Sequence, residues 1–297
     1  MTKFIHIGLG KCGSKFLQEK IFPKISKKLN IQYIKLYDNK YIKINKYKIK
    51  FHAFEKFQKC EKLLPEKFII SHESLFSYRW EFSRVYKSFN ILKKNFSKKT
   101  KILIVIRNPY QLLNSIYCQS IQDMKIVPPE KFFYYKVFDE KIRNGNKFNL
   151  YNFNYEKLIS LYRSYFNDVI VVKYENLGNF NFLKKIFDLD NDYIKYLSLL
   201  KKKKINKSIS KFGINFILFL NNYLNLSKYD QFIRNYLKTP DKLINKIRNK
   251  ILAEFLIRNL FQSRIDKILP YKKYLINKKL IPIDIDKEVI KYKKLNY

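Results

Sequence analysis

The chain has 297 residues, a formal net charge of +38 and a hydrophobic content of 46%. These values allow a sizeable core, so they exclude an intrinsically disordered chain and suit one large α/β domain or two small ones. The three cysteines Cys12, Cys60 and Cys118 show no paired spacing and no Cys/His cluster, which argues against a disulfide scaffold and against a zinc site.

No apolar segment approaches the roughly 20 residues that a transmembrane helix needs, and the N-terminus lacks a signal-peptide pattern. We therefore expect a cytoplasmic protein that can also lie at the inner face of the membrane. The charge permits an anionic partner, including peripheral association with an anionic membrane. Because the lysines are spread along the chain, specific nucleic-acid binding is not expected, and A/T-rich codon usage is an equal explanation for them. The sequence indicates no oligomeric state.

Apolar runs alternate with helical patterns along the first 200 residues, which predicts a βαβ architecture with a parallel sheet. Strands are expected at residues 4–9, 31–37, 67–71, 101–106 and 169–173. Residues 41–51 alternate apolar and charged side chains, as in an exposed strand or hairpin. Helices are expected from Ser14, over 75–96, from Pro109 and over 154–166. Beyond residue 201 the pattern becomes mostly helical.

A glycine-rich segment lies between the first strand and its helix. It reads Gly8-Leu9-Gly10-Lys11-Cys12-Gly13-Ser14-Lys15. Glycines allow backbone N–H groups to approach phosphate oxygens, and the start of a helix adds free donors and a favourable dipole. Lys11 and Lys15 add positive charge. We interpret the segment as an anion-binding loop; the alternative is an ordinary tight turn between a strand and a helix.

A kinase-type Walker loop is the obvious competitor for this segment. Gly8 and Gly13 have the required spacing, but Ser14 precedes Lys15, so the hydroxyl lies one residue too early for the usual Mg²⁺ ligand. A nucleotide kinase therefore stays only an alternative. A non-catalytic binder of anionic surfaces, which the net charge permits, is the other.

Two further strand ends carry polar residues. His72 and Glu73 follow the strand at 67–71, and Arg107 follows the strand at 101–106. Parallel sheets present their chemistry at the carboxyl ends of strands. Arg107 suits bidentate phosphate recognition, and Ser115 lies two turns along the helix that Asn108 is expected to cap. The alternative for Ser115 is a hydroxyl bonded to the helix backbone.

Together these motifs resemble the sulfotransferases that use 3′-phosphoadenosine 5′-phosphosulfate (PAPS). In that family a strand ends in Gly-x-x-Lys/Arg-x-Gly-Ser/Thr-Ser/Thr, which HIGLGKCGSKFLQ matches closely. The resemblance implies that Lys11 contacts the phosphosulfate bridge and that Gly13 and Ser14 hold the 5′-phosphate. Lys15 departs from the family's second hydroxyl residue. The donor-binding residues implied here are Lys11, Cys12, Gly13, Ser14, Lys15 and Phe16.

The resemblance extends to the second anchor, where the strand, Arg107 and Ser115 match the family's 3′-phosphate site. It also places the general base near the strand at 67–71, as a glutamate in some branches and a histidine in others. We prefer Glu73 over His72; the alternative is that Glu73 caps the following helix.

Two later segments also match the family. Residues 171–177 resemble its Tyr-Glu-Asp-Leu strand signature, which we interpret as architectural. Residues 204–210 resemble a basic Asn-x-Ser loop that closes over the donor, which makes Asn206 and Ser208 donor-binding candidates. The alternative is a helix start capped by Ser208 or Ser210. His6 lies within a buried strand and is expected to be a core histidine.

The sequence therefore predicts a single domain, 1–297, with an α/β donor-binding core at 1–200 and a helical extension at 201–297. The resemblance implies a P-loop NTPase-like sulfotransferase fold and an enzyme that transfers a sulfuryl group from PAPS to a hydroxyl or amine of a carbohydrate, a lipid or a small metabolite. PAPS would be the co-substrate, and no metal is expected.

Overall fold

The computed structural model describes residues 2–35, 41–44, 47–50, 60–76, 82–122, 126–136, 147–200, 210–224 and 273–295. The chain forms two compact units. The first comprises Met1–Pro109, Leu150–Ile205 and Asp286–Tyr297, and the second comprises Tyr110–Asn149 and Asn206–Ile285. Residues 110–149 thus group with the second unit and residues 286–297 with the first, and the expected division at residue 200 stays a prediction.

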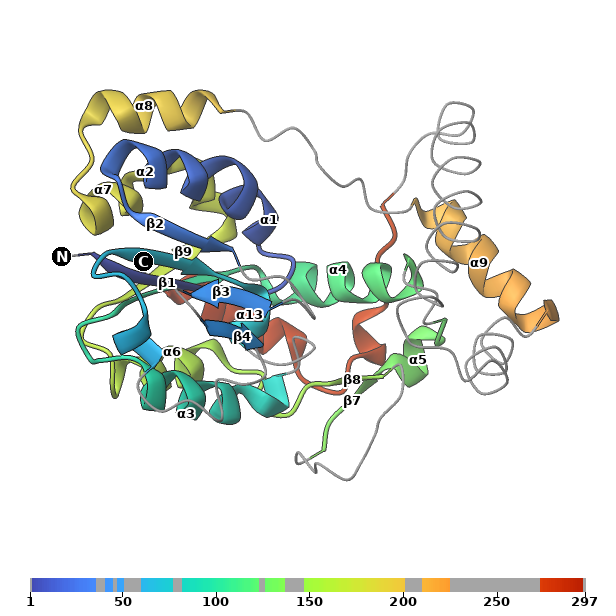
Figure 1. The fold of residues 1–297 in the computed structure, drawn as a ribbon. Helices are drawn as coiled ribbons and strands as arrows, with labels where there is room; N and C mark the ends of the chain where they lie inside the picture. Colours follow the sequence, from blue (N-terminus) through green and yellow to red (C-terminus); the bar gives the residue numbers. More distant parts are fainter. Residues whose placement is uncertain are drawn as a thin grey trace. The chain divides into compact units, whose positions relative to one another are not determined.

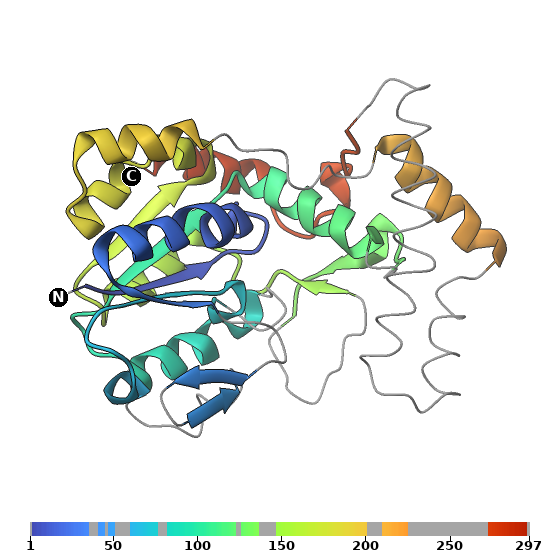
Figure 2. The same cartoon turned by 45° about the horizontal axis from the view of Figure 1, so that its top comes forward.

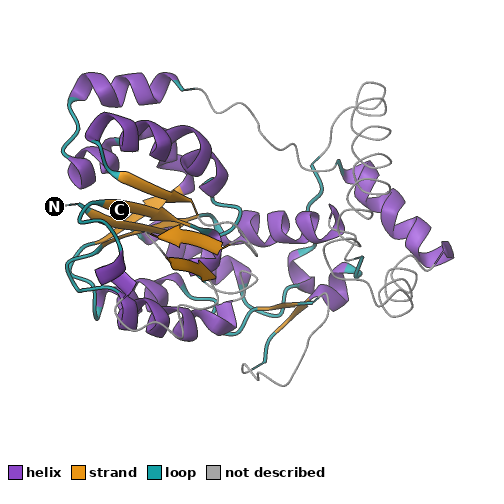
Figure 3. Cartoon of the chain, viewed as in Figure 1, coloured by secondary structure: helices purple, strands orange, loops and turns teal. Residues whose placement is uncertain are grey.

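The first unit is built on a five-stranded sheet in the order β2-β5-β1-β6-β9. Its strands are β1 (Lys3–Gly8), β2 (Gln32–Lys35), β5 (Phe68–Ser71), β6 (Lys101–Ile106) and β9 (Val169–Lys173). Every neighbouring pair in this sheet is parallel, and the arrowheads in Figure 3 accordingly point to one edge. The expected α/β class with a parallel sheet flanked by helices is confirmed.

The strands are the apolar runs of the sequence. Residues 102–106 of β6 are completely buried, as are Phe4, Ile5 and Ile7 of β1. Burial on both faces explains why these strands are continuous apolar runs rather than alternating ones. β1 is the middle strand of the five, between β5 and β6.

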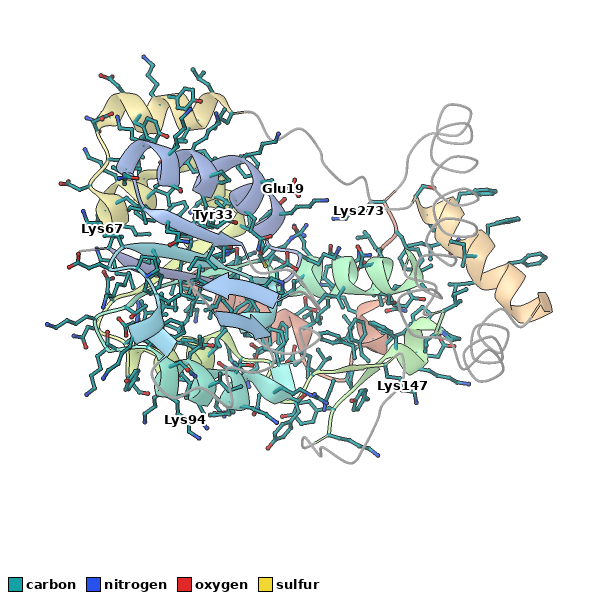
Figure 4. All side chains as sticks on the ribbon, viewed as in Figure 1. Glu19, Tyr33, Lys67, Lys94, Lys147 and Lys273 are labelled. Atoms are coloured by element: carbon teal, nitrogen blue, oxygen red, sulfur yellow. The ribbon has the colours of Figure 1, made fainter. Side chains whose placement is uncertain are left out.

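Helices cover both faces of the sheet, as Figures 1 and 2 show. On one face lie α1 (Ser14–Phe16), the π-helical η1 (Leu17–Ile21), α2 (Phe22–Leu29), α7 (Asn181–Phe187) and α8 (Asn191–Leu199). On the other face lie α3 (Val85–Asn95) and α6 (Tyr155–Arg163). Asn154 caps α6, because its side-chain Oδ1 accepts a hydrogen bond from the Lys157 N–H at 2.9 Å. Basic side chains such as Lys94 on α3 project outward (Figure 4).

The order of the strands determines where the sheet can bind a ligand. The chain leaves β1 toward β2 on one side and leaves β6 toward β9 on the other, although β1 and β6 are neighbours. Such a reversal between adjacent parallel strands is a topological switch point, and ligands of open α/β sheets bind outside the carboxyl ends of those strands. The loops after β1 and β6 therefore occupy the binding position of this fold.

The second unit contains α4 (Pro109–Gln122), which starts at the last residue of the first unit. It also contains α5 (Pro129–Phe132), β7 (Phe133–Tyr134), β8 (Phe148–Asn149), α9 (Lys211–Leu224) and η9 (Lys278–Leu280). Asn114 of α4 holds the late segment of the chain. Its side-chain amide donates to the Tyr274 carbonyl at 2.8 Å and accepts from the Ile276 amide at 3.0 Å.

Two local expectations have clear outcomes. The hairpin at 41–51 is confirmed as the antiparallel pair β3 (Tyr41–Ile44) and β4 (Tyr47–Lys50). The helix expected at 75–96 is confirmed over α3 (Val85–Asn95), whereas the described residues before it form the 3-10 turns η4 (Glu73–Leu75) and η6 (Phe82–Arg84). The Phe82 ring, buried 4.5 Å from Phe153 and 5.0 Å from Phe76, fixes the chain where the helix was expected.

Within the described part of the chain, none of the helices has both the length and the apolar character required to cross a membrane.

Candidate functional site

The loop after β1 has the backbone conformation that its glycines predict. Gly8 and Gly13 have φ values of 87° and 80°, and Lys11 between them has a φ of 65°. The left-handed region is accessible to glycine without strain but is uncommon for lysine. The loop is therefore tightly folded around Lys11, with the helical run from Ser14 directly after it.

Close packing is a second reason why this loop needs glycine. A Cβ at Gly13 would lie 2.7 Å from Cδ2 of Leu177 and 3.1 Å from Cε2 of Tyr174. Both residues belong to the 3-10 segment η7 (Tyr174–Asn179), which follows β9. Residues 171–177 were interpreted as architectural, and this contact shows how they support the loop: η7 covers Gly13 and leaves no room for a side chain.

The loop offers backbone donors at the start of the helical run. Among the described residues no hydrogen bond uses the N–H groups of Gly13, Ser14 or Lys15, and Gly13 lacks a side-chain cap. The buried Ser14 hydroxyl donates to the Leu9 carbonyl at 3.1 Å, and the Cys12 amide donates to the same oxygen at 3.3 Å. These two bonds hold the loop closed, while the amides of Gly13, Ser14 and Lys15 are available to an anion.

Arg107 joins the loop from the end of the neighbouring strand β6. Its Nη1 donates to the Lys11 carbonyl at 3.0 Å, and its guanidinium lies 4.7 Å from the centre of the Tyr174 ring. Its Nε is buried and has no hydrogen-bond partner among the described residues. A buried, unpaired donor on a cation is costly unless a ligand completes it. Arg107 therefore combines a fixed position with unused donor capacity toward an anion.

Glu73 lies beside the other end of the loop. A Cβ at Gly8 would come within 2.9 Å of the Glu73 Cα, so the chain after β5 packs directly on the end of β1. Glu73 is half-buried, whereas His72 is only 9% exposed. The charge of His72 contributes to lowering the pKa of His6, so His72 interacts with a histidine that is buried in β1. Of the two candidate bases, Glu73 is the one that the solvent reaches.

His6 is a core histidine, as expected. It is fully buried in β1, and its Nδ1 and the Ser71 Oγ of β5 are 2.7 Å apart. Burial lowers the pKa of His6 to about 3, with a smaller contribution from His72. The imidazole is therefore neutral at physiological pH and stabilises the pairing of β1 with β5 instead of exchanging protons with a ligand.

Electrostatic interactions at Cys12 show that the candidate residues share one neighbourhood. The Cys12 side chain is completely buried, and burial raises the pKa of its thiol strongly. Arg107 opposes this rise in pKa, while Glu73 and Glu175 add to it. A buried thiol with a raised pKa is a poor nucleophile. Cys12 therefore contributes packing and its backbone, and the charged side chains of Arg107, Glu73 and Glu175 influence its thiol.

The remaining predicted residues are placed as follows. Lys15 is exposed, and its Nζ lies 4.0 Å from Glu19 one helical turn later. The Phe16 ring is buried 6.1 Å from the Phe180 ring, so only its backbone can face a ligand. Ser115 is half-exposed on α4 and belongs to the second unit.

The expected closing loop at 204–210 is described only at its end. Asn206 and Ser208 lie outside the described residues. The Ser210 hydroxyl accepts from the Gly213 amide at 3.2 Å, which makes Ser210 the cap of α9. For Ser210 the structure thus supports the simpler interpretation, a capped helix start.

Sequence reasoning missed Tyr155 and Tyr292 around Arg107, and it gave Tyr174 and Glu175 only an architectural role. Tyr174 lies under its guanidinium, and the buried Tyr155 donates from its hydroxyl to the Arg107 carbonyl at 2.7 Å. Glu175 accepts a hydrogen bond from the Tyr292 hydroxyl of α13 (Ile285–Lys294). The motif around Tyr174 and Glu175 was visible in the sequence, but nothing distinguishes Tyr155 or Tyr292 among the 24 tyrosines of the chain.

The arrangement can bind an anion through the backbone amides at the start of the helical run and through the positive charges of Lys11 and Arg107. It also places the Glu73 carboxylate beside the same loop. In the described part of the chain, no group of three or more His, Cys, Asp or Glu side chains is arranged to hold a metal ion. Comparison of the sequence with models of protein families and with curated proteins found no match.

Proposed function

We propose that this protein is a PAPS-dependent sulfotransferase with a P-loop-like sulfotransferase fold. The observation that carries the proposal is the bond between Arg107 and the Lys11 carbonyl. It joins the two motifs that resemble the family's 5′-phosphosulfate and 3′-phosphate anchors, and it does so at the switch point of the sheet.

The donor would be held by charge and by backbone donors. The amides of Gly13, Ser14 and Lys15 are available to the 5′-phosphate, and the fixed guanidinium of Arg107 suits a second phosphate. Requiring a 3′-phosphate is how such a site would discriminate PAPS from ATP.

The reaction is an in-line displacement at sulfur. An oxygen or nitrogen of the acceptor forms a bond to sulfur while the bond from sulfur to the bridging oxygen breaks, and 3′,5′-ADP leaves with the electron pair. Glu73 accepts the proton of the acceptor. Lys11 and the loop amides stabilise the charge that grows on the bridging oxygen. The exposure of Glu73 and the inward position of His72 favour this assignment.

The acceptor carries its hydroxyl or amine on a carbohydrate, a lipid or a small metabolite, with a cell-surface glycan or a lipid as the first candidates, and the net charge of +38 suits an acceptor that carries negative charge. The proposal is tested by incubating the protein with ³⁵S-labelled PAPS and a panel of polysaccharides, lipids and small phenols. Transfer of label, matched by release of 3′,5′-ADP and lost in Lys11→Ala, would support it. Absence of transfer to every class, together with phosphate transfer from ATP, would favour the kinase instead.

A further inference from the structure

The last described helix of the chain is attached to the candidate site by Tyr292. Its hydroxyl donates to the carboxylate of Glu175, the second residue of η7. Its ring centre lies 6.1 Å from that of Tyr155. Tyr292 is buried, and all three residues belong to the first unit. Tyr292 thus contacts Glu175 and Tyr155, which both lie more than 100 residues earlier in the chain.

Both contacts of Tyr292 lead to Arg107. Through Glu175 it holds the start of η7, where the neighbouring Tyr174 ring supports the guanidinium at 4.7 Å. Through its ring it packs on Tyr155, whose hydroxyl binds the Arg107 carbonyl at 2.7 Å. The backbone and the side chain of Arg107 are therefore fixed by separate routes that converge at one tyrosine.

The hydroxyl of Tyr292 stays protonated in this position. Burial raises its pKa, and the hydrogen bond to Glu175 and the charge of Glu175 raise it further, while Arg107 opposes the change in pKa. A neutral O–H donor on a carboxylate is a charge-assisted hydrogen bond, which is stronger than a bond between neutral groups.

Lys173 strengthens the same attachment. Its Nζ donates to the Lys293 carbonyl at 3.3 Å and lies 5.1 Å from the centre of the Tyr292 ring. The cation thus binds the carboxyl end of α13, where the helix dipole favours positive charge, and it also contacts the ring that faces Tyr155. The end of β9 and the end of the last helix are held together at Tyr292.

We infer that Tyr292 is a positioning residue for the donor site, which acts by holding Arg107 in place for the 3′-phosphate of the donor. The inference rests on the proposed function. A long arginine side chain loses considerable conformational freedom when it is fixed, so a scaffold that fixes it before binding increases ligand affinity. Tyr292 does not touch the reacting atoms and has no role in proton transfer.

The test is calorimetric titration of the full chain with 3′,5′-ADP. Tyr292→Phe keeps the ring against Tyr155 and removes only the hydroxyl. We expect it to weaken 3′,5′-ADP binding about tenfold, which is the size of one lost charge-assisted hydrogen bond. Glu175→Ala should weaken 3′,5′-ADP binding by the same factor. Glu175→Gln can still accept the hydrogen bond from the Tyr292 hydroxyl, so it should retain most of the affinity.

Tyr165→Phe is the matched control, because Tyr165 also donates its hydroxyl, at 3.1 Å to the Phe96 carbonyl, away from Arg107. It should leave 3′,5′-ADP affinity unchanged. A second control uses an Arg107→Ala background, in which Tyr292→Phe should cause no further loss, since coupled residues are not additive.

The outcomes separate the inference from the proposed function. If the wild-type protein fails to bind 3′,5′-ADP, the proposed function falls and this inference falls with it. If the wild type binds and folded Tyr292→Phe binds equally well, only the inference is overturned. Equal losses from Tyr292→Phe in the presence and absence of Arg107 would also overturn it, because Tyr292 would then act independently of Arg107.

Discussion

The guanidinium of Arg107 donates a hydrogen bond to the backbone carbonyl of Lys11 at 3.0 Å. The two residues are 96 positions apart and follow neighbouring parallel strands, β6 and β1. Arg107 therefore holds the backbone of the loop after β1, and it is also the proposed contact for the 3′-phosphate. Loss of its side chain would remove a cation and release the loop at the same time.

Arg107→Ala should weaken binding of 3′,5′-ADP by about 2–4 kcal/mol, because a charge-assisted contact with a phosphate is lost. Arg107→Lys should fall between the wild type and Arg107→Ala, since lysine keeps the charge but not the planar fork. Titration calorimetry on protein whose circular dichroism is unchanged measures both. Wild-type affinity in folded Arg107→Ala would remove Arg107 from the donor site.

Glu73→Gln separates binding from chemistry. Glutamine keeps the size of the side chain but cannot accept the proton, so kcat should fall about 10²–10⁴-fold while 3′,5′-ADP affinity stays nearly constant. His72→Gln is the matched control and should keep its turnover, because His72 is buried beside His6. The rate of single-turnover sulfuryl transfer at saturating donor, measured for both variants, distinguishes Glu73 from His72 as the general base. A fully active Glu73→Gln with an inactive His72→Gln would assign the role to His72.

His6 predicts a pH dependence of folding. Its pKa is lowered from 6.5 to about 3 in the folded protein, so between these values the unfolded chain binds one more proton than the folded chain. The free energy of unfolding therefore rises with pH across this window, with a contribution of up to about 1.4 kcal/mol per pH unit, and the contribution is complete above pH 6.5.

The measurement is urea unfolding of wild type and His6→Gln at several pH values between 4 and 7. Glutamine cannot titrate there, so the variant should show a shallower loss of stability on acidification. Carboxylates also titrate below pH 5, and the comparison of the two slopes isolates the histidine. Identical slopes in the two proteins would mean that His6 is protonated in the folded state, contrary to its burial.

Much of the sheet was predictable because its signals are local. The run at 102–106 is apolar throughout and lies in β6, and the glycine-rich segment after the first strand was recognisable from its composition. The helix expected at 75–96 begins only at Val85, after 3-10 turns where the Phe82 ring packs against Phe76 and Phe153.

The supports of the site could not be predicted, because they depend on contacts between distant segments. The position of Glu73 against Gly8 follows from the pairing of β1 with β5. Tyr155 and Tyr292 have no motif around them, and only the return of the last helix to the first unit brings them near Arg107. A side chain that positions another leaves no signature in a single sequence.

The identity of the donor is tested most directly by titration calorimetry with two nucleotides. We expect 3′,5′-ADP to bind the wild-type protein without Mg²⁺ and to raise its Tm by mass action, whereas ATP with Mg²⁺ should bind far more weakly. Tight binding of ATP with Mg²⁺, together with no detectable binding of 3′,5′-ADP, would show that the protein does not use PAPS as its donor.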